Sequence, residues 1–176
     1  MEDIKVKEYL KIRIDHYPYH KTLNEKIIED VKMLHFYPPE ENYAFTNIMG
    51  SQYNFDVGKE PDSIKILLQW IRNIIFTIKI TQHKVINPGS SWLAKYNKGD
   101  YTIKHDHSPS TFSFVYFVRS PKGSSPLVFS TSGKRINPEE GKVVIFPGTM
   151  LHHVPKNKVD GRMTYAGNIT ITSEGY

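Results

Sequence analysis

The stretch from residue 91 to residue 118 reads SWLAKYNKGDYTIKHDHSPSTFSFVYFV, and it decides the fold class. It contains three short runs rich in apolar and aromatic residues, 91–96, 101–107 and 111–118, each of the length typical of a β-strand. The turn-forming sequence Asn97-Lys98-Gly99-Asp100 separates the first two runs. This stretch therefore predicts consecutive strands joined by tight turns.

Further short strands are expected on the C-terminal side of this stretch, at 127–130, 142–146 and 163–172. Turn signals rich in glycine separate them, at 121–123, 132–134 and 140–141. Six short strands at such spacing are typical of a sandwich or barrel. We predict a jelly roll.

Two helices are expected in the N-terminal half. Residues 4–14 alternate apolar and polar, as one or two half-buried strands would. Thr22 then resembles an N-cap, with Glu25 three positions later, and apolar residues recur at helical spacing up to Leu34. This first helix should end before Pro38.

A second helix is predicted from residues 61–63 to about Ile80, with a broad apolar face that should cover a sheet. Four polar residues interrupt it, so we do not expect it to cross a membrane. Residues 40–58 should be strand pieces and loop, and Asn87-Pro88-Gly89 should separate the helical part from the strands.

The length of 176 residues suits one domain, with 1–90 as helical support and N-terminal strands and 91–172 as the jelly-roll core. The chain has no cysteine, so any metal must be held by nitrogen and oxygen ligands. Its net charge of +5 is compatible with a nucleic-acid or acidic partner, although no run of five like charges occurs. The N-terminal sequence MEDIKVKEYL lacks a signal peptide's apolar core, so we expect a cytoplasmic protein.

Histidines form the clearest chemical pattern. His105 and His107 flank Asp106, and alternation along a strand would put both imidazoles on one face and the carboxylate on the other. His152 follows a later predicted strand, and Arg162 lies ten residues beyond it. Three such ligands can hold a metal ion with open positions for substrate or oxygen. The alternative for each histidine is an ordinary hydrogen-bonded residue, and for Arg162 an ion pair with a surface acid.

The segments 91–118, GKVVIFPGTMLHHVP (141–155) and GRMTYAGNI (161–169) resemble the double-stranded β-helix core, a cupin-like jelly roll, of Fe(II)/2-oxoglutarate oxygenases. The resemblance is greatest to the prolyl-hydroxylase-like branch and to small oxygenases of phages and bacteria. It covers residues 91 to 170. It implies a dioxygenase, and the cytoplasm expected from the N-terminal sequence would be that of the host if the chain is viral.

The resemblance implies that His105 and His152 are iron ligands. His152 is preferred to His153 because the family's distal histidine usually precedes an x-Val pair. His107 departs from the pattern, since most of the family has Asp or Glu there. A bulge that turned Asp106 inward would restore a carboxylate, and this alternative stays open beside ligation by His107.

Other roles follow from the same resemblance. Arg162 matches the residue that forms a salt bridge with the far carboxylate of 2-oxoglutarate, and Thr164, on the same strand face, would add a hydroxyl. Tyr96 matches a tyrosine that often reaches the cosubstrate. Asn168 falls where relatives line the substrate side.

The implied activity is hydroxylation coupled to the decarboxylation of 2-oxoglutarate, with Fe(II) and O₂ as cofactors and ascorbate as a possible reductant. A peptidyl substrate such as a prolyl residue is slightly favoured over a small molecule or a nucleobase, and the oligomeric state is open. Two other classes remain: a jelly-roll module that binds a metal or small acid without turnover, and a basic nucleic-acid-binding protein.

Overall fold

The computed structural model describes residues 10–41, 47–78 and 84–173 of the chain. It contains two helices, α1 (His20–Asp30) and α2 (Asp62–Phe76). Its strands in chain order are β1 (Arg13–His16), β2 (Ile48–Met49), β3 (Ser51–Phe55), β4 (Lys84–Tyr96), β5 (Tyr101–His105), β6 (Phe112–Arg119), β7 (Leu127–Phe129), β8 (Arg135–Ile136), β9 (Lys142–Pro147), β10 (His152–Val154) and β11 (Arg162–Ser173).

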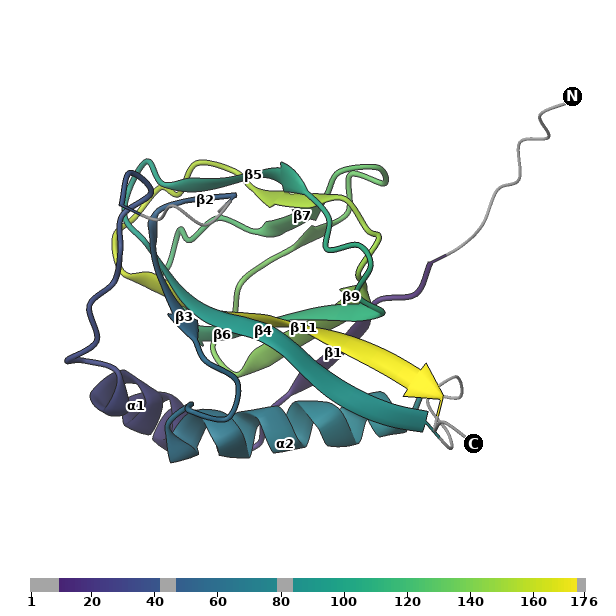
Figure 1. Cartoon of the computed structure of the whole chain (residues 1–176). Helices are drawn as coiled ribbons and strands as arrows, with labels where there is room; N and C mark the ends of the chain where they lie inside the picture. Colours follow the sequence, from purple (N-terminus) through teal and green to yellow (C-terminus); the bar gives the residue numbers. More distant parts are fainter. Residues whose placement is uncertain (1–9, 42–46, 79–83, 174–176) are drawn as a thin grey trace, which may run out of the picture.

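The strands form two antiparallel sheets that face each other, and both helices lie under the larger one (Figure 1). The six-stranded sheet has the order β1-β9-β6-β11-β4-β3, and the five-stranded sheet the order β2-β5-β10-β7-β8. Neighbouring strands are often distant in sequence, as expected where strands cross between two sheets. The predicted jelly roll with two supporting helices is confirmed.

The long pair of β4 and β11 forms the middle of the large sheet, with Arg162 opposite Tyr96 at one end. The predicted break at Asn87-Pro88-Gly89 is wrong, because these residues lie inside β4. The ladder shifts register nearby, between Gly167 and Ile169. Pro88 fits there because β3 pairs only with later residues of β4, so that no strand of the described residues pairs with this edge.

Gly167 permits close packing at this irregularity. A Cβ atom on Gly167 would lie 2.8 Å from Cζ of the Phe114 ring and 3.1 Å from the carbonyl oxygen of Ser90. Any larger side chain would have to displace one of them. Phe114 can therefore pack directly beneath β11.

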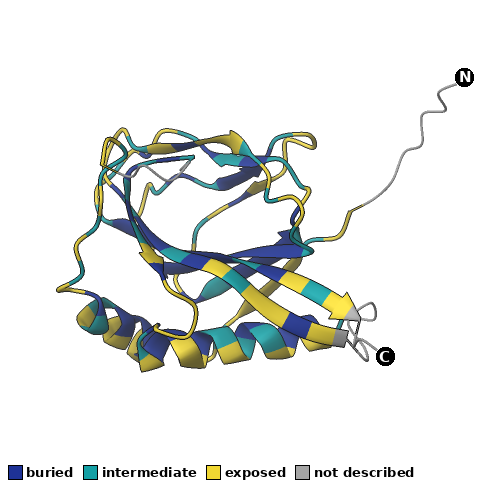
Figure 2. Cartoon of the chain, viewed as in Figure 1, coloured by how far each residue is buried: buried dark blue, intermediate teal, exposed yellow. Residues whose placement is uncertain are grey.

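Burial divides the interior into two apolar layers (Figure 2). One lies between the helices and the large sheet and includes Ile27 of α1, Leu67 and Ile71 of α2, and Tyr116 and Tyr165 of the sheet. The other lies between the two sheets. Because side chains alternate along a strand, the inner strands β6 and β9 of the large sheet supply residues to both layers. A strand that is buried on both faces, such as β6, is therefore apolar along nearly its whole length.

The helix boundaries differ from those predicted. Helix α1 begins at His20 with Tyr19 as its N-cap, so the predicted cap Thr22 is wrong. The first turn of α1 is polar, so the spacing of apolar residues did not reveal where the helix begins. The helix ends at Asp30, but Val31 and Leu34 still pack on the core from a turn, which extended the apparent helical spacing.

Helix α2 begins where expected, after Pro61, but ends at Phe76 rather than near Ile80. The hydroxyl of Thr77 donates to the carbonyl of Ile74 at the helix end. Of the residues described, no helix is long and apolar enough to cross a membrane.

The N-terminal expectation of strands over 4–14 falls partly outside the described residues, which begin at 10. Residues 10–12 have no regular structure, and β1 begins at Arg13 and pairs with β9. The predicted strand pieces within 40–58 are confirmed as β2 and β3. Sequence patterns missed β8 and β10, which have two and three residues and are too short to show a period.

Candidate metal centre

Three histidines meet between the two sheets. His105 is the last residue of β5, His107 follows two positions later, and His152 is the first residue of β10. One ligand nitrogen from each ring lies within 4.8 Å of the others. His105 and His152 are cross-strand partners, so the pairing of β5 with β10 brings them together. The structure thus assembles the three histidines that the sequence singled out.

Hydrogen bonds fix the direction of two of these rings. Nδ1 of His105 lies 2.7 Å from the carbonyl oxygen of Ile103, and Nδ1 of His152 lies 2.8 Å from that of Met150. Since a carbonyl oxygen only accepts, each Nδ1 must carry the proton and donate it. The Nε2 lone pair of each ring is left for a metal ion, as is common in proteins.

His107 reaches the cluster by a different route from the one predicted. The strand ends at His105, so alternation does not place His107. Instead its backbone N–H donates to the carbonyl oxygen of Gly148 at 2.7 Å, and its own carbonyl accepts from the N–H of Ser110. The His107 ring also packs near Trp92, with ring centroids 5.6 Å apart.

Asp106 lies away from the three rings. Its side chain is exposed, and Oδ1 accepts a hydrogen bond from the backbone N–H of Ser108 at 3.0 Å. This bond is the main reason that the pKa of Asp106 is lowered. The geometry brings the imidazole of His107 into the cluster and leaves the carboxylate of Asp106 in a turn.

All three imidazoles favour the neutral form. Burial lowers the pKa of His107 to about 4 and that of His152 to about 3, and it also lowers the pKa of His105. Proximity to His105 lowers the first two further. Neutral imidazole is the form that binds metal ions, so near pH 7 the cluster needs to lose no protons before it can act as a ligand set.

Arg162 lies deep in the same cavity, with 1% of its surface exposed. Its guanidinium stacks over the ring of Tyr96, with Cζ 4.4 Å from the centroid, and lies 5.6 Å from that of Phe117. Within the described part of the chain, Nε and Nη1 have no hydrogen-bond partner and no acid pairs with the group. The alternative of an ion pair with a surface acid is therefore wrong.

An unpaired buried guanidinium is a strong indication of an anion site. Burial lowers the pKa of Arg162, while the nearby Tyr96 hydroxyl opposes this shift. Arginine nevertheless stays protonated in proteins, and a buried charge is costly unless it is paired. An anion with two oxygens would match the fork of the side chain.

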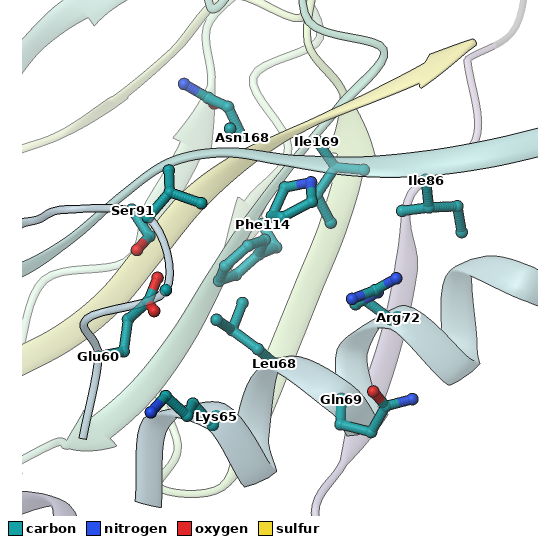
Figure 3. A pocket seen from close by; sticks show the side chains of 14 residues that line it. Glu60, Lys65, Leu68, Gln69, Arg72, Ile86, Ser91, Phe114, Asn168 and Ile169 are labelled. Atoms are coloured by element: carbon teal, nitrogen blue, oxygen red, sulfur yellow. The ribbon is translucent and has the colours of Figure 1, made fainter. Parts of the chain in front are cut away.

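Two of the remaining predicted residues, Thr164 and Tyr96, line the same cavity as Arg162. Thr164 is buried and lines the cavity with Arg162. The hydroxyl of Tyr96 lies 2.8 Å from Oγ1 of Thr102. Asn168 lies farther along β11 and is not among the residues that line the histidine cavity; its Oδ1 accepts from Oγ of Ser113, and it borders the cavity shown in Figure 3.

Trp92 and Thr102 are among the cavity residues that were missed from the sequence. The alternation of Trp92, Ala94 and Tyr96 along β4 places all three on one face and could have identified the tryptophan. His153, which was set aside, indeed lies elsewhere, with Nδ1 2.8 Å from Oγ of Ser130.

Solved structures share this arrangement of strands. A viral collagen prolyl hydroxylase from Paramecium bursaria Chlorella virus-1, solved as a 2-oxoglutarate complex, superposes with a TM-score of 0.68 at 15% identity, over 92% of this chain and 96% of that one. A prolyl-4-hydroxylase from Pseudomonas putida gives 0.67 at 14% identity, over 93% of each chain. The fold is that of 2-oxoglutarate-dependent oxygenases.

A third structure with the oxygenase fold is HygX from Streptomyces hygroscopicus, solved with nickel, 2-oxoglutarate and hygromycin B. It matches with a TM-score of 0.67 at 9% identity, over 90% of this chain and 82% of that one. No family model and no curated protein matches the chain by sequence. At these sequence identities the structural similarity establishes the fold. The chemistry has to be inferred from the residues of the site.

Proposed function

We propose that this chain is an iron(II)- and 2-oxoglutarate-dependent oxygenase. One observation carries the proposal: the buried, unpaired guanidinium of Arg162 lies in the same cavity as three converging neutral imidazoles. A metal-chelating dicarboxylate is the kind of ligand that would use both groups at once. The shared oxygenase fold supports this assignment.

The histidines fit a divalent metal ion. His105 and His152 present Nε2, and His107 completes a three-cornered set that leaves positions open on the metal. Three neutral ligands leave the ion its full double charge, whereas a carboxylate in place of His107 would cancel one unit. We assign these three residues as metal ligands and leave Asp106 outside the set.

The guanidinium of Arg162 would bind the far carboxylate of 2-oxoglutarate, and Thr164 would donate its hydroxyl to the same group. Tyr96 would support Arg162 from below through their stacked contact. The cavity measures about 40 Å³, which is smaller than 2-oxoglutarate. We therefore expect side chains around Arg162 to shift when this cosubstrate binds.

Fe(II) with 2-oxoglutarate and O₂ would supply the oxidising chemistry, coupling decarboxylation to succinate with oxidation of a substrate C–H bond, and ascorbate would keep the iron reduced. The chain would hold these partners in place and limit access of water. Trp92 lines the cavity beside His107, where a substrate would approach, and Asn168, farther along β11, stays a predicted substrate contact. We favour hydroxylation of a peptidyl residue because two structures of similar fold are prolyl hydroxylases. We expect the reaction to take place in the cytoplasm.

A succinate assay tests the proposal. Purified chain with Fe(II), ascorbate and O₂ should convert 2-oxoglutarate to succinate, slowly even without the substrate, as followed by nuclear magnetic resonance (NMR). His152→Ala should abolish the conversion, whereas His35→Ala, an exposed histidine outside the cavity, should not. Binding of 2-oxoglutarate without formation of succinate would instead support a binding module. This outcome is tested because the ligand set has a histidine where most of the family has a carboxylate.

A further inference from the structure

A second cavity lies on the opposite side of the large sheet from the histidines. It has a volume of about 280 Å³, close to the lower end for small-molecule sites. Its walls are α2, the segment before α2 and the helix-facing sides of β4, β6 and β11 (Figure 3). Most of the wall between its ends is apolar, from Leu68, Ile86, Phe114 and Ile169.

One end of this cavity carries a buried carboxylate. Glu60 is 6% exposed and Ser91 is 5% exposed, and Figure 3 shows their polar groups pointing toward one another. Glu60 makes no ion pair with any described residue, and both Glu60 and Ser91 interact with the buried hydroxyl of Tyr165. Lys65 borders the cavity, but its Nζ lies 3.6 Å from Asp62 on the exposed side of the helix. Among the described residues, Glu60 therefore has no cationic partner to offset the burial of its carboxylate.

The other end carries a guanidinium. Arg72 extends from α2 to the cavity, and its Nε is buried with no partner among the described residues. Figure 3 places Arg72 away from Glu60, with Leu68 and Phe114 between them. Their charged atoms do not come within the 4.0 Å of a salt bridge. The cavity thus has an acid at one end, a base at the other and an apolar wall between.

We propose that this cavity binds a small zwitterion whose amine and carboxylate are separated by a short apolar chain. The amine would lie at Glu60 and Ser91, the carboxylate at Arg72, and the chain against Leu68 and Phe114. A ligand with only one charge would leave the opposite protein group unpaired. This site is distinct from the histidine cavity and does not depend on the proposed oxygenase activity.

Three probes test the proposal on the metal-free chain: ε-aminocaproate, hexylamine and caproate. In NMR titrations, ε-aminocaproate should shift the methyl resonances of Leu68, Ile86 and Ile169 at concentrations about tenfold lower than either singly charged probe, since one charge-assisted hydrogen bond is worth about that factor. Equal binding of all three probes, or shifts confined to other residues, would overturn the proposal. This comparison uses the unaltered chain, so it does not depend on how a variant folds.

Variants assign the two ends. Glu60→Gln should remove the advantage of ε-aminocaproate over caproate, and Arg72→Gln its advantage over hexylamine. Glu29→Gln and Arg119→Gln alter exposed groups outside the cavity and should leave the affinities unchanged. Unaltered probe preference in Glu60→Gln and Arg72→Gln variants with native spectra would also contradict the assignment.

Discussion

The backbone N–H of His107 donates to the carbonyl oxygen of Gly148 at 2.7 Å, and the N–H of Gly148 donates to the carbonyl of Thr111. The third histidine of the cluster is therefore positioned by the turn between β9 and β10. His152 follows that same turn four residues later. Two ligands from distant parts of the chain thus depend on one short segment.

Gly148→Ala should disturb the cluster. A Cβ at this position would lie 2.1 Å from the carbonyl oxygen of Ser110 and 3.4 Å from that of His107, so the backbone on one side must move. Overpacking of this kind typically costs about 1–3 kcal/mol. We expect the Ni(II) affinity, measured by calorimetry, to fall. The fall should exceed what the loss of folding stability, measured by urea unfolding, would account for. Thr149→Ala, an exposed neighbour, is the control, and equal Ni(II) affinity in both variants would contradict the expectation.

Arg162→Ala should weaken binding of 2-oxoglutarate while leaving the metal content nearly unchanged, because in our proposal the guanidinium binds the far carboxylate and is not a metal ligand. Loss of a charge-assisted bidentate contact corresponds to about tenfold or more in affinity. Calorimetry with Mn(II)-loaded chain measures this. Arg162→Lys should recover only part of the affinity, and Arg119→Ala, on the exposed end of β6, should lose none. Unchanged cosubstrate affinity in Arg162→Ala would remove this residue from the role.

His107→Asp should change which metal is preferred. A carboxylate suits Mn(II) better than an imidazole does, whereas imidazole suits Ni(II). We expect the ratio of Ni(II) to Mn(II) affinity to fall in this variant, as measured by competition with a fluorescent chelator. A ratio equal to that of the unaltered chain would indicate that position 107 does not touch the metal.

Asp106→Asn should leave the metal affinities unchanged, because the Asp106 carboxylate accepts from Ser108 and lies outside the cluster. The same competition experiment measures this. An affinity loss comparable with that of His107→Ala would restore the alternative in which Asp106 turns inward to bind the ion.

Acid should destabilise the metal-free chain through its buried histidines. The pKa of His107 is about 4 in the folded chain against 6.5 for the ordinary group. Between these values the unfolded chain binds a proton that the folded chain does not, so stability is lost as pH falls from 6.5 toward 4. The free energy of unfolding should drop by on the order of 1–2 kcal/mol from this group by about pH 5.

Urea unfolding of the unaltered chain and of His107→Gln, at about pH 8 and about pH 5, measures that drop. The variant should lose less stability on acidification, whereas His35→Gln, an exposed histidine, should behave as the unaltered chain does. An identical drop in the His107→Gln variant would show that His107 is not the buried neutral group described above.

Sequence patterns predicted the sheets because long alternating or apolar runs such as β6 reflect burial directly. They also predicted which histidines meet, since the order of ligands along the chain was informative. They failed where a contact between distant segments decided the outcome. The bond from His107 to Gly148 and the stacking of Arg162 on Tyr96 leave no trace in local periodicity.

Sequence patterns also failed to predict short or irregular elements. A strand of three residues such as β10 is held by its partners β5 and β7 and shows no pattern of its own. Pro88 and Gly89 looked like a break because such residues usually end a strand, yet the ladder to β11 continues through Pro88. Tertiary pairing overrode the local signal in both places.

Because His105 and His152 are far apart along the chain, metal binding by the cluster would be coupled to folding. Their rings meet only after β5 and β10 have paired, so an ion held by all three histidines would bind the native chain and hardly the unfolded one. At a hundredfold excess over its dissociation constant, such an ion adds about 2.7 kcal/mol to the unfolding free energy. The melting temperature of this protein would then rise on adding Ni(II) and fall again with a chelator, so that a simple heating curve would report metal loading before any substrate is known.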